Sequence, residues 1–360
     1  SRNSRGIAAY LHRDRLRSAA MALAAPSSND WVDIERYLAA KEKELLASGG
    51  VNLAEGHMDG YKYKPRLKIV EKQPWDVLAV PDAAPVCSAA NWQHQDLKLE
   101  VGNGIAYLTM SRPDVNNVIR QSLSQALSDA CIELHKAKDI RVVVLQAVGK
   151  MFCAGASPQA FMDKESMSEI ANKKADTAFM RFLHYFQSLP QFTIGLCQGS
   201  CMGSGLGLLA VCDYVVAVGT ARFTSSDVKL GTTPATIAPF LSTKMGPANA
   251  KRVLCLGENL SAQKMQEMGL VSEVVEEAAD FSTVVAELCE NLTQSAPIAT
   301  GRSKRLVQNV ASRPITPALV NYTGGELASI RVGEEAIKGM VAVQARTKPY
   351  WAENKIMPLY

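Results

Sequence analysis

The sequence has 360 residues, of which 47% are hydrophobic and 21% charged, and its formal net charge is +4. This balance excludes a disordered chain and predicts a soluble protein with a buried core in one large domain or two. The 39 basic residues are nearly matched by 35 acidic ones, and only 6% of the residues are aromatic. We therefore expect no nucleic-acid partner, since phosphates need a basic surface and bases need stacking rings.

The first 25 residues are rich in Arg, Ser and Ala, with Asp14 as their one acidic residue. This composition is typical of organelle transit peptides, and a basic surface helix explains it equally well. We expect an organellar location, with the mitochondrial matrix favoured over the plastid. Residues 1–97 are otherwise irregular, apart from an amphipathic helix predicted at residues 31–47. We assign residues 1–97 to an N-terminal extension that is a targeting remnant, a docking arm for a larger complex, or both.

From residue 97 onward, strand and helix patterns alternate. Residues 99–110 predict a hairpin that turns at Asn103-Gly104, and residues 121–138 predict a helix. This alternation indicates an α/β fold with helices packed on sheets, and no sequence repeat of about 20–50 residues is apparent. Apolar runs predict buried strands at residues 141–148, 192–197 and 214–218, and residues 277–337 are mostly helical in pattern.

Two features have alternative interpretations, and a buried core explains both better. Residues 182–212 contain no Asp, Glu, Lys or Arg and could cross ~30 Å of hydrocarbon. Their Gln, Ser, Pro and Gly residues instead predict a strand, a Gly-rich turn and a buried helix, so we expect no transmembrane span. The eight cysteines lie mostly in apolar runs such as residues 252–256. We expect buried thiols in a reducing compartment, and no metal site.

Two loops have the composition of ligand-binding turns. Residues 149–157 and residues 198–207 each follow a predicted strand and are rich in Gly, Ala and Ser. Small residues let backbone N–H groups approach a ligand, and a helix N-terminus adds partial positive charge. Two such turns facing one another would form an oxyanion hole for a carbonyl that becomes an enolate. A dinucleotide fingerprint at Gly203-x-Gly205-x-Gly207 is a weaker interpretation, because its third glycine falls one place early.

These two loops resemble the paired oxyanion turns of the crotonase (enoyl-CoA hydratase/isomerase) superfamily. Residues 152–157 are similar to its F-[CSA]-A-G-A-D pattern, and residues 199–208 to its G-x-[AC]-x-G-G-G-x-E-L pattern. The resemblance covers about residues 97–352 and is nearest to methylglutaconyl-type hydratases and to the dehydratases of polyketide β-branching. Four further blocks resemble the family in order and spacing: residues 111–117, 221–234, 261–271 and 335–349.

The resemblance implies an α/β fold with a crotonase-like ββα spiral core over residues 98–276. Residues 277–360 would be the C-terminal helical, trimerisation region of the same domain. The expected assembly is a homotrimer or a dimer of trimers (a hexamer), with a possible larger complex docked through residues 1–97. The expected substrate is an acyl thioester of coenzyme A, or of an acyl-carrier protein, as in fatty acid metabolism. No tightly bound cofactor and no metal are expected.

Positions in the motifs imply the site residues. The oxyanion donors would be the backbone N–H groups of Ala156 and Ser204, and the catalytic acid/base would be Asp227. For Asp227, a capping or solvated turn acid beside Ser225-Ser226 is the alternative, and for Lys348 a solvated surface lysine. Substrate and coenzyme A contacts are implied for Asp114, Val115, Asn117, Lys150, Ala154, Ser157, Gly203, Gly205 and Lys348.

The chain departs from the family at its catalytic positions. A hydratase of the family uses two glutamates, one as base and the other as acid. Here Gly207 stands at the first position and Asp227 at the second, and Ser157 replaces the usual Asp. Where many members have a nucleotide-binding lysine, this chain has Pro158 and Gln159.

Three functions fit these departures. The first, which we expect, is a lyase that hydrates or dehydrates an enoyl or 3-hydroxyacyl thioester with Asp227 as its one carboxylate. The second is a decarboxylase or double-bond isomerase of the same superfamily, in which the oxyanion hole dominates. The third is a catalytically degenerate subunit that keeps the fold for a structural role in a larger organellar assembly.

Overall fold

The computed structural model describes residues 56–58, 61–63, 93–156, 168–311, 313–353 and 355–358. The chain divides into two compact units, Ser1–Asp76 and Val77–Tyr360. In the first unit the described residues form one antiparallel pair, β1 (Gly56–Met58) with β2 (Tyr61–Tyr63). The helix predicted at residues 31–47 lies outside the described residues.

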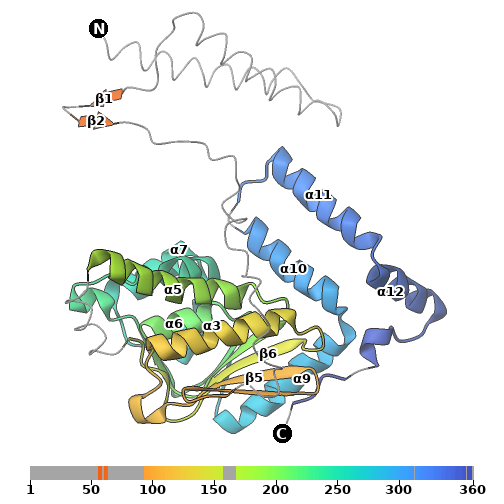
Figure 1. The fold of residues 1–360 in the computed structure, drawn as a ribbon, viewed down its shortest axis with the longest axis horizontal. Helices are drawn as coiled ribbons and strands as arrows, with labels where there is room; N and C mark the ends of the chain where they lie inside the picture. Colours follow the sequence, from red (N-terminus) through yellow and green to blue (C-terminus); the bar gives the residue numbers. More distant parts are fainter. Residues whose placement is uncertain are drawn as a thin grey trace, which may run out of the picture. The chain divides into compact units, whose positions relative to one another are not determined.

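The second unit is built on two mixed sheets, with helices α3, α5 and α6 drawn over the larger one (Figure 1). The larger sheet has seven strands in the order β13-β10-β8-β6-β5-β4-β3, and the smaller has four in the order β12-β11-β9-β7. The strands of the larger sheet are β3 (Gln93–His94), β4 (Leu97–Gly102), β5 (Ile105–Met110), β6 (Val142–Ala147), β8 (Phe192–Cys197), β10 (Tyr214–Val218) and β13 (Glu273–Val275). Those of the smaller sheet are β7 (Met151–Cys153), β9 (Ser200–Met202), β11 (Arg222–Thr224) and β12 (Leu260–Ser261).

Parallel pairing in both sheets creates a ββα spiral. Strands β6, β8 and β10 run parallel in the larger sheet, and β7, β9 and β11 do the same in the smaller one. Each pair of strands leads into a helix: α5 (Glu169–Gln187), α6 (Ser204–Ala210) and α7 (Ala238–Leu256). The spiral fold implied by the resemblance is therefore confirmed, although its turns share an arrangement of strands and helices rather than a repeated sequence.

The hairpin, helix and strands predicted over residues 99–218 are confirmed to within two residues at each boundary, whereas the predicted helical stretch 277–337 extends further, to the end of α12 at Ala345. Asn103 and Gly104 have φ angles of 50° and 78°, as a two-residue hairpin turn requires. Residues 182–212 hold the end of α5, then β8, β9 and α6. Across the described residues, no helix is long and apolar enough to span a membrane.

The core lies between the larger sheet and the helices that cover it. Strand β5 is buried at every position, because strands flank it on both sides and other elements cover both of its faces. On α5, Phe182 and Phe186 are fully buried one turn apart, with ring centroids 6.1 Å apart. Helix α3 (Gln121–Lys136) packs on α5.

Six of the seven described cysteines are buried, and burial raises the pKa of the Cys153 and Cys212 thiols to about 12. For Cys255 the expectation of burial was wrong, because its side chain is exposed. It lies in the last turn of α7, where Val253 and Leu254 face the core while the next two residues face solvent.

The C-terminal region is helical, as predicted. Helix α11 (Pro317–Arg331) packs on α10 (Pro297–Val310), and α12 (Glu334–Ala345) packs on α11. The carboxylate of Glu335 on α12 accepts hydrogen bonds from the N–H groups of Ile298 (3.0 Å) and Ala299 (2.9 Å) and so caps α10. The remaining elements are η3 (Pro113–Val115), η4 (Asp227–Leu230), α8 (Ala262–Glu267), η5 (Ala278–Asp280), α9 (Phe281–Gln294), α10 (Pro297–Val310), α11 (Pro317–Arg331), α12 (Glu334–Ala345) and η6 (Tyr350–Ala352).

Candidate active site

The two small-residue loops meet at one end of the smaller sheet. Strands β7 and β9 are parallel, with Cys153 opposite Cys201, and a loop follows each strand. A Cβ added at Gly155 would lie 2.7 Å from the carbonyl oxygen of Met202 and 3.3 Å from the Cα of Gly203. The φ angle of Gly155 is +78°, a conformation that disfavours any side chain. Only glycine at this position allows the two loops to touch through their backbones.

Two backbone N–H groups beside this contact have no acceptor in the part of the chain that the structure describes. Ala156 is exposed and forms an isolated parallel bridge with Ile119. Ser204 is the first residue of α6, so its N–H has no acceptor within the helix. In the described part of the chain, neither N–H has a hydrogen-bond acceptor. Two free donors on touching loops are what a developing oxyanion requires.

Asp227 is carried to the same end of the smaller sheet. Strand β11 runs parallel to β9, and the N–H of Gly203 donates to the carbonyl oxygen of Thr224 at 2.9 Å. The chain then enters η4, which begins at Asp227. The fully buried Ser225 donates its hydroxyl to Asp227 Oδ2 at 2.8 Å. The bond restrains one carboxylate oxygen, while Oδ1 has no partner among the described residues.

The position that the resemblance assigns to a first glutamate has no room for a side chain. Gly207 is buried within α6, and a Cβ there would lie 2.5 Å from Cγ2 of Ile237 and 3.1 Å from Cδ1 of Leu183. Ile237 immediately precedes α7, and Leu183 lies on α5. Helix α6 has the sequence Ser-Gly-Leu-Gly-Leu-Leu-Ala and bears no titratable side chain. Of the two positions at which the resemblance implies a carboxylate, only residue 227 bears one.

Asn117 holds the first loop through hydrogen bonds from its side-chain amide. Its side chain is fully buried, and Nδ2 donates to the carbonyl oxygens of Val148 at 2.9 Å and Met151 at 3.0 Å. Its Oδ1 accepts the N–H of Arg112 at 2.9 Å. The N–H of Ala154 is also occupied, because it donates to the carbonyl oxygen of Asn116 at 3.0 Å. The Asn117 amide and the Ala154 N–H therefore position the loop.

Arg112, five residues before Asn117, forms ion pairs with two carboxylates. Arg112 lies 2.7 Å from buried Asp96 and 3.2 Å from exposed Asp114. The hydrogen bond to Asp114, together with that to Asp96, raises the pKa of Arg112. Burial alone would raise the pKa of Asp96, but hydrogen bonds from Ser122 and Arg112 outweigh burial and lower it. Arg112 is thus committed to two carboxylates.

The other predicted contact residues are distributed around the loops and beyond them. Lys150 is exposed just before β7, and Val115 is half-buried in η3. Gly205 lets α6 pack closely on the smaller sheet, because a Cβ at this position would lie 2.9 Å from Cβ of Cys153 in β7. Lys348 is exposed beyond α12. Ser157 lies outside the described residues.

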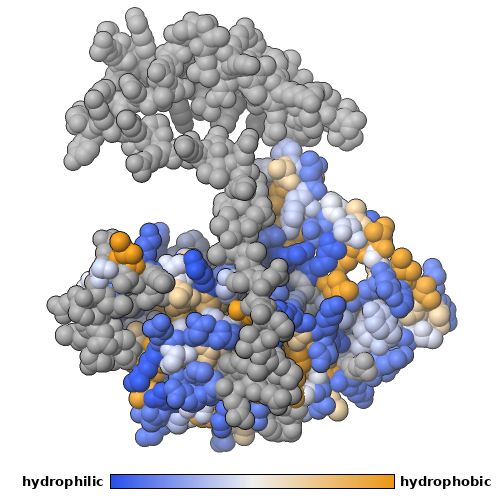
Figure 2. Space-filling model, in the orientation of Figure 1, coloured by the Kyte–Doolittle hydropathy of each residue, from blue (hydrophilic) through white to orange (hydrophobic). Residues whose placement is uncertain are grey.

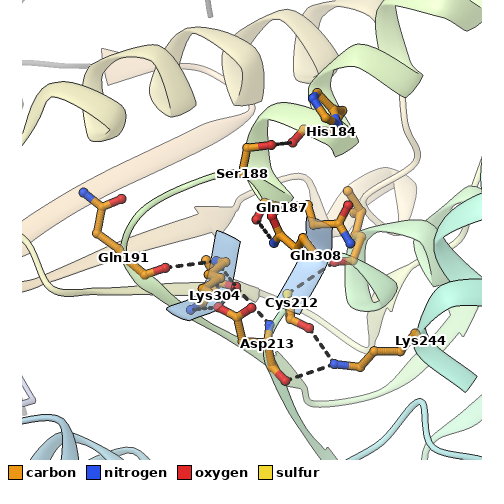
Figure 3. A network of polar contacts seen from close by, with 11 residues as sticks. His184, Gln187, Ser188, Gln191, Cys212, Asp213, Lys244, Lys304 and Gln308 are labelled. Atoms are coloured by element: carbon orange, nitrogen blue, oxygen red, sulfur yellow. Dashed lines mark hydrogen bonds and ion pairs between the residues drawn. The ribbon is translucent and has the colours of Figure 1, made fainter. Parts of the chain in front are cut away.

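A network of polar contacts surrounds the segment that follows α6 (Figure 3). Asp213 Oδ2 accepts the N–H (2.8 Å) and hydroxyl (2.9 Å) of Thr193 and lies 2.7 Å from Nζ of Lys304 on α10. On α7, Lys244 donates to the carbonyl oxygens of Cys212 (2.7 Å) and Asp213 (3.0 Å), and burial lowers its pKa. These bonds tie the segment after α6 to α7, α10 and the larger sheet.

Two residues that shape the site had not been predicted from the sequence, Ser225 and Ile237. For Ser225 a signal was present, since Ser-x-Asp spacing allows a hydroxyl to bond the carboxylate two residues on. For Ile237 there was none, because its contact with Gly207 joins segments 30 residues apart.

Known proteins of one family share the sequence pattern and the fold of this chain. The sequence pattern of the enoyl-CoA hydratase/isomerase family matches residues 100–354, more than half of the chain. An enoyl-CoA hydratase of Alternaria alternata is 30% identical over 206 residues, 57% of this chain and 67% of that protein.

Two further relatives cover more of the chain. The mitochondrial enoyl-CoA hydratase domain-containing protein 3 of Xenopus laevis is 27% identical over 278 residues, 75% of this chain and 90% of that protein. The crystal structure of an enoyl-CoA hydratase from Shewanella pealeana has a TM-score of 0.69 at 26% identity and covers 71% of this chain and 96% of that chain. With the fold and the paired loops, these matches show that the chain belongs to the enoyl-CoA hydratase/isomerase family.

Proposed function

We propose that the protein dehydrates a 3-hydroxyacyl thioester, or hydrates the corresponding enoyl thioester, with Asp227 as its acid/base. The observation that carries the proposal is the backbone contact of the two loops at Gly155. This contact joins the loops that carry the N–H groups of Ala156 and Ser204, and β11, which runs parallel to β9, leads to Asp227. The family acts on coenzyme A thioesters, generally without a tightly bound cofactor.

The chemistry balances with one carboxylate. In the dehydration direction, Asp227 takes the Cα proton, and the electron pair moves to the thioester oxygen held by the two N–H groups. As the carbonyl re-forms, the Cβ–O bond breaks, and the leaving hydroxyl takes the proton back from Asp227 and departs as water. One group serves first as base and then as acid. We assign the transfer to Oδ1, because the Ser225 hydroxyl occupies Oδ2.

The substrate we propose carries a short or branched acyl group on coenzyme A or on an acyl-carrier protein. The support is the resemblance of the chain to methylglutaconyl-type hydratases and to polyketide β-branching dehydratases, in which residues 234–240 take part. Exposed residues at the edge of the first loop, Asp114 and Lys150, are the proposed contacts for the carrier. The side chain of Asn117 would act only through the loop that it holds.

A panel of short and branched enoyl and 3-hydroxyacyl thioesters, on both carriers, tests this function. Wild-type protein should turn over at least one of them, and Asp227→Asn should lower kcat by roughly 10²–10⁴-fold, the usual contribution of a positioned acid/base. Asp139→Asn is the matched control, because Asp139 is an exposed acid in the turn before β6. Unchanged turnover in Asp227→Asn would exclude Asp227 as the acid/base.

A second candidate, a non-catalytic subunit of an assembly, is favoured by the buried Gly207 at a catalytic position. We propose homotrimers, or dimers of trimers, for either function, because the C-terminal helices carry exposed apolar side chains. Figure 2 shows hydrophobic residues along α11 and α12. They include Val320, Leu327, Val332, Ile337, Met340, Val341 and Val343. Calorimetry that detects no binding of any thioester would favour the non-catalytic subunit. Sedimentation of the purified protein as a monomer would exclude the homotrimer and the dimer of trimers.

We propose the mitochondrial matrix as the location. The support is the Arg- and Ser-rich composition of the first 25 residues and the mitochondrial name of the Xenopus laevis relative. Residues 1–97 would then act in targeting, in docking to a larger complex, or in both. A fluorescent protein fused behind residues 1–97 should enter mitochondria, and a diffuse signal would exclude targeting by this segment.

A further inference from the structure

The side chain of Ile237 fills the space that a Cβ at Gly207 would occupy. Gly207 lies inside α6, where glycine is a poor helix former, so its presence needs a packing reason. That reason is Cγ2 of Ile237, which occupies the space 2.5 Å from where a Cβ would lie. Cβ of the same isoleucine lies 3.3 Å from that point. Replacing Gly207 by any other residue therefore requires movement of Ile237.

Ile237 has little freedom to move. It is 1% exposed, and its own N–H donates to the carbonyl oxygen of Pro234 at 3.2 Å. Its carbonyl oxygen accepts the N–H of Leu241 at 3.0 Å, in the first turn of α7. Leu183, the other neighbour of Gly207, is fully buried. The space beside Gly207 is thus closed by two apolar side chains in a densely packed region.

The position of this contact relates it to the proposed chemistry. Helix α7 packs on both α6 and η4. Ile237, which immediately precedes α7, therefore lies where these elements meet: α6 carries the Ser204 N–H, and η4 begins at Asp227. A carboxylate on α6 would have to enter this apolar space and lose its hydration without a partner, which is strongly unfavourable.

We infer that Ile237 is a specificity-determining residue, which limits the site to one carboxylate by filling the space beside Gly207. The inference rests on the proposed function, because it takes Asp227 as the acid/base. A site with Asp227 as its one carboxylate accepts substrates in which this carboxylate reaches both the Cα proton and the leaving hydroxyl, or the attacking water in the reverse direction. Reactions that need a second, separately placed acid are excluded.

A double-mutant cycle tests the packing without any activity measurement. Gly207→Ala should lower the melting temperature by several degrees, whereas in an Ile237→Gly background the same change should raise it. Gly324→Ala is the matched control, since Gly324 lies inside α11 with nothing within 4 Å of an added Cβ, and it should not lower the melting temperature. If Ile237→Gly does not fold, Ile237→Ala replaces it in the cycle. Equal effects of Gly207→Ala in both backgrounds would overturn the inference.

The pH dependence of kcat/KM tests the chemical consequence, with the thioester that wild-type protein turns over. Gly207→Glu with Ile237→Gly should add a second carboxylate limb that is absent from wild type and from Ile237→Gly alone. Two carboxylate limbs in the wild-type profile would overturn the inference, as would a Gly207→Glu single variant that is as stable as wild type. Turnover that survives Asp227→Asn would instead refute the proposed function, and the stability cycle would still report on Ile237.

Discussion

Replacing Gly155 by alanine should separate the two loops and damage both stability and catalysis. Gly155 has a φ of +78°, and an added Cβ would lie 2.7 Å from the carbonyl oxygen of Met202. That separation is shorter than any normal carbon–oxygen contact, and the opposing atom belongs to the backbone, so no side chain can rotate away. The backbone at Met202 and Gly203 must shift, and the Ser204 N–H at the start of α6 shifts with it.

The expected cost has two parts. The left-handed conformation costs alanine roughly 1–2 kcal/mol, and forcing a methyl group into a packed contact costs roughly 1–3 kcal/mol more. Gly231→Ala isolates the first part, because Gly231 has a φ of +74° and nothing within 4 Å of an added Cβ. We expect Gly155→Ala to destabilise the protein by about 2–5 kcal/mol and Gly231→Ala by about 1–2 kcal/mol.

Urea unfolding and thioester turnover measure the two consequences. A misplaced oxyanion donor lowers kcat by roughly 10²–10³-fold, so Gly155→Ala should lose activity at temperatures where it is still folded. Equal stability of Gly155→Ala and Gly231→Ala would show that the two loops do not touch. Unchanged kcat in folded Gly155→Ala would show that their contact does not set the oxyanion donors.

Three further predictions concern the supports of the fold. Asp96→Asn should destabilise the protein by about 2–4 kcal/mol at neutral pH, because it breaks a buried ion pair with Arg112. Since the folded pKa of Asp96 is lowered, its stabilisation is present above the unfolded value of about 3.9 and is lost as pH falls through the folded value. Urea unfolding should therefore show the wild type and Asp96→Asn converging below about pH 4, and a constant difference would contradict this. Glu335→Ala should weaken the cap of α10 by about 1–2 kcal/mol. Hydrogen exchange should therefore become faster than in wild type for α10 but not for α3, and an unchanged exchange rate in α10 would argue against the cap. Arg346→Gly should raise stability by about 0.5–1 kcal/mol in thermal unfolding, because Arg346 holds a left-handed φ of 55° at the end of α12; a loss would mean that its side chain matters more than its backbone.

The sequence by itself determined the local elements and the chemistry of the loops. Asn103-Gly104 specified the hairpin because only a few residue types adopt positive φ at low cost, and that preference acts within the turn. The apolar runs specified β8 and β10 because burial of a whole strand leaves a continuous hydrophobic pattern. The motif around Gly155 indicated the family and the oxyanion turns. Each of these signals is contained in about ten consecutive residues or fewer.

Only the tertiary structure decided how the loops meet and which groups remain free. The amide of Asn117 proved to be used inside the protein, because segments that follow β5 and β6 converge on it. The closure of the space at Gly207 depends on Ile237, and the restraint on Asp227 depends on the burial of Ser225. Such contacts join segments far apart in sequence, and their distances arise when α6, α7 and the smaller sheet pack together. Residue type shows what a side chain can do, and packing decides which of its capacities are left for a ligand.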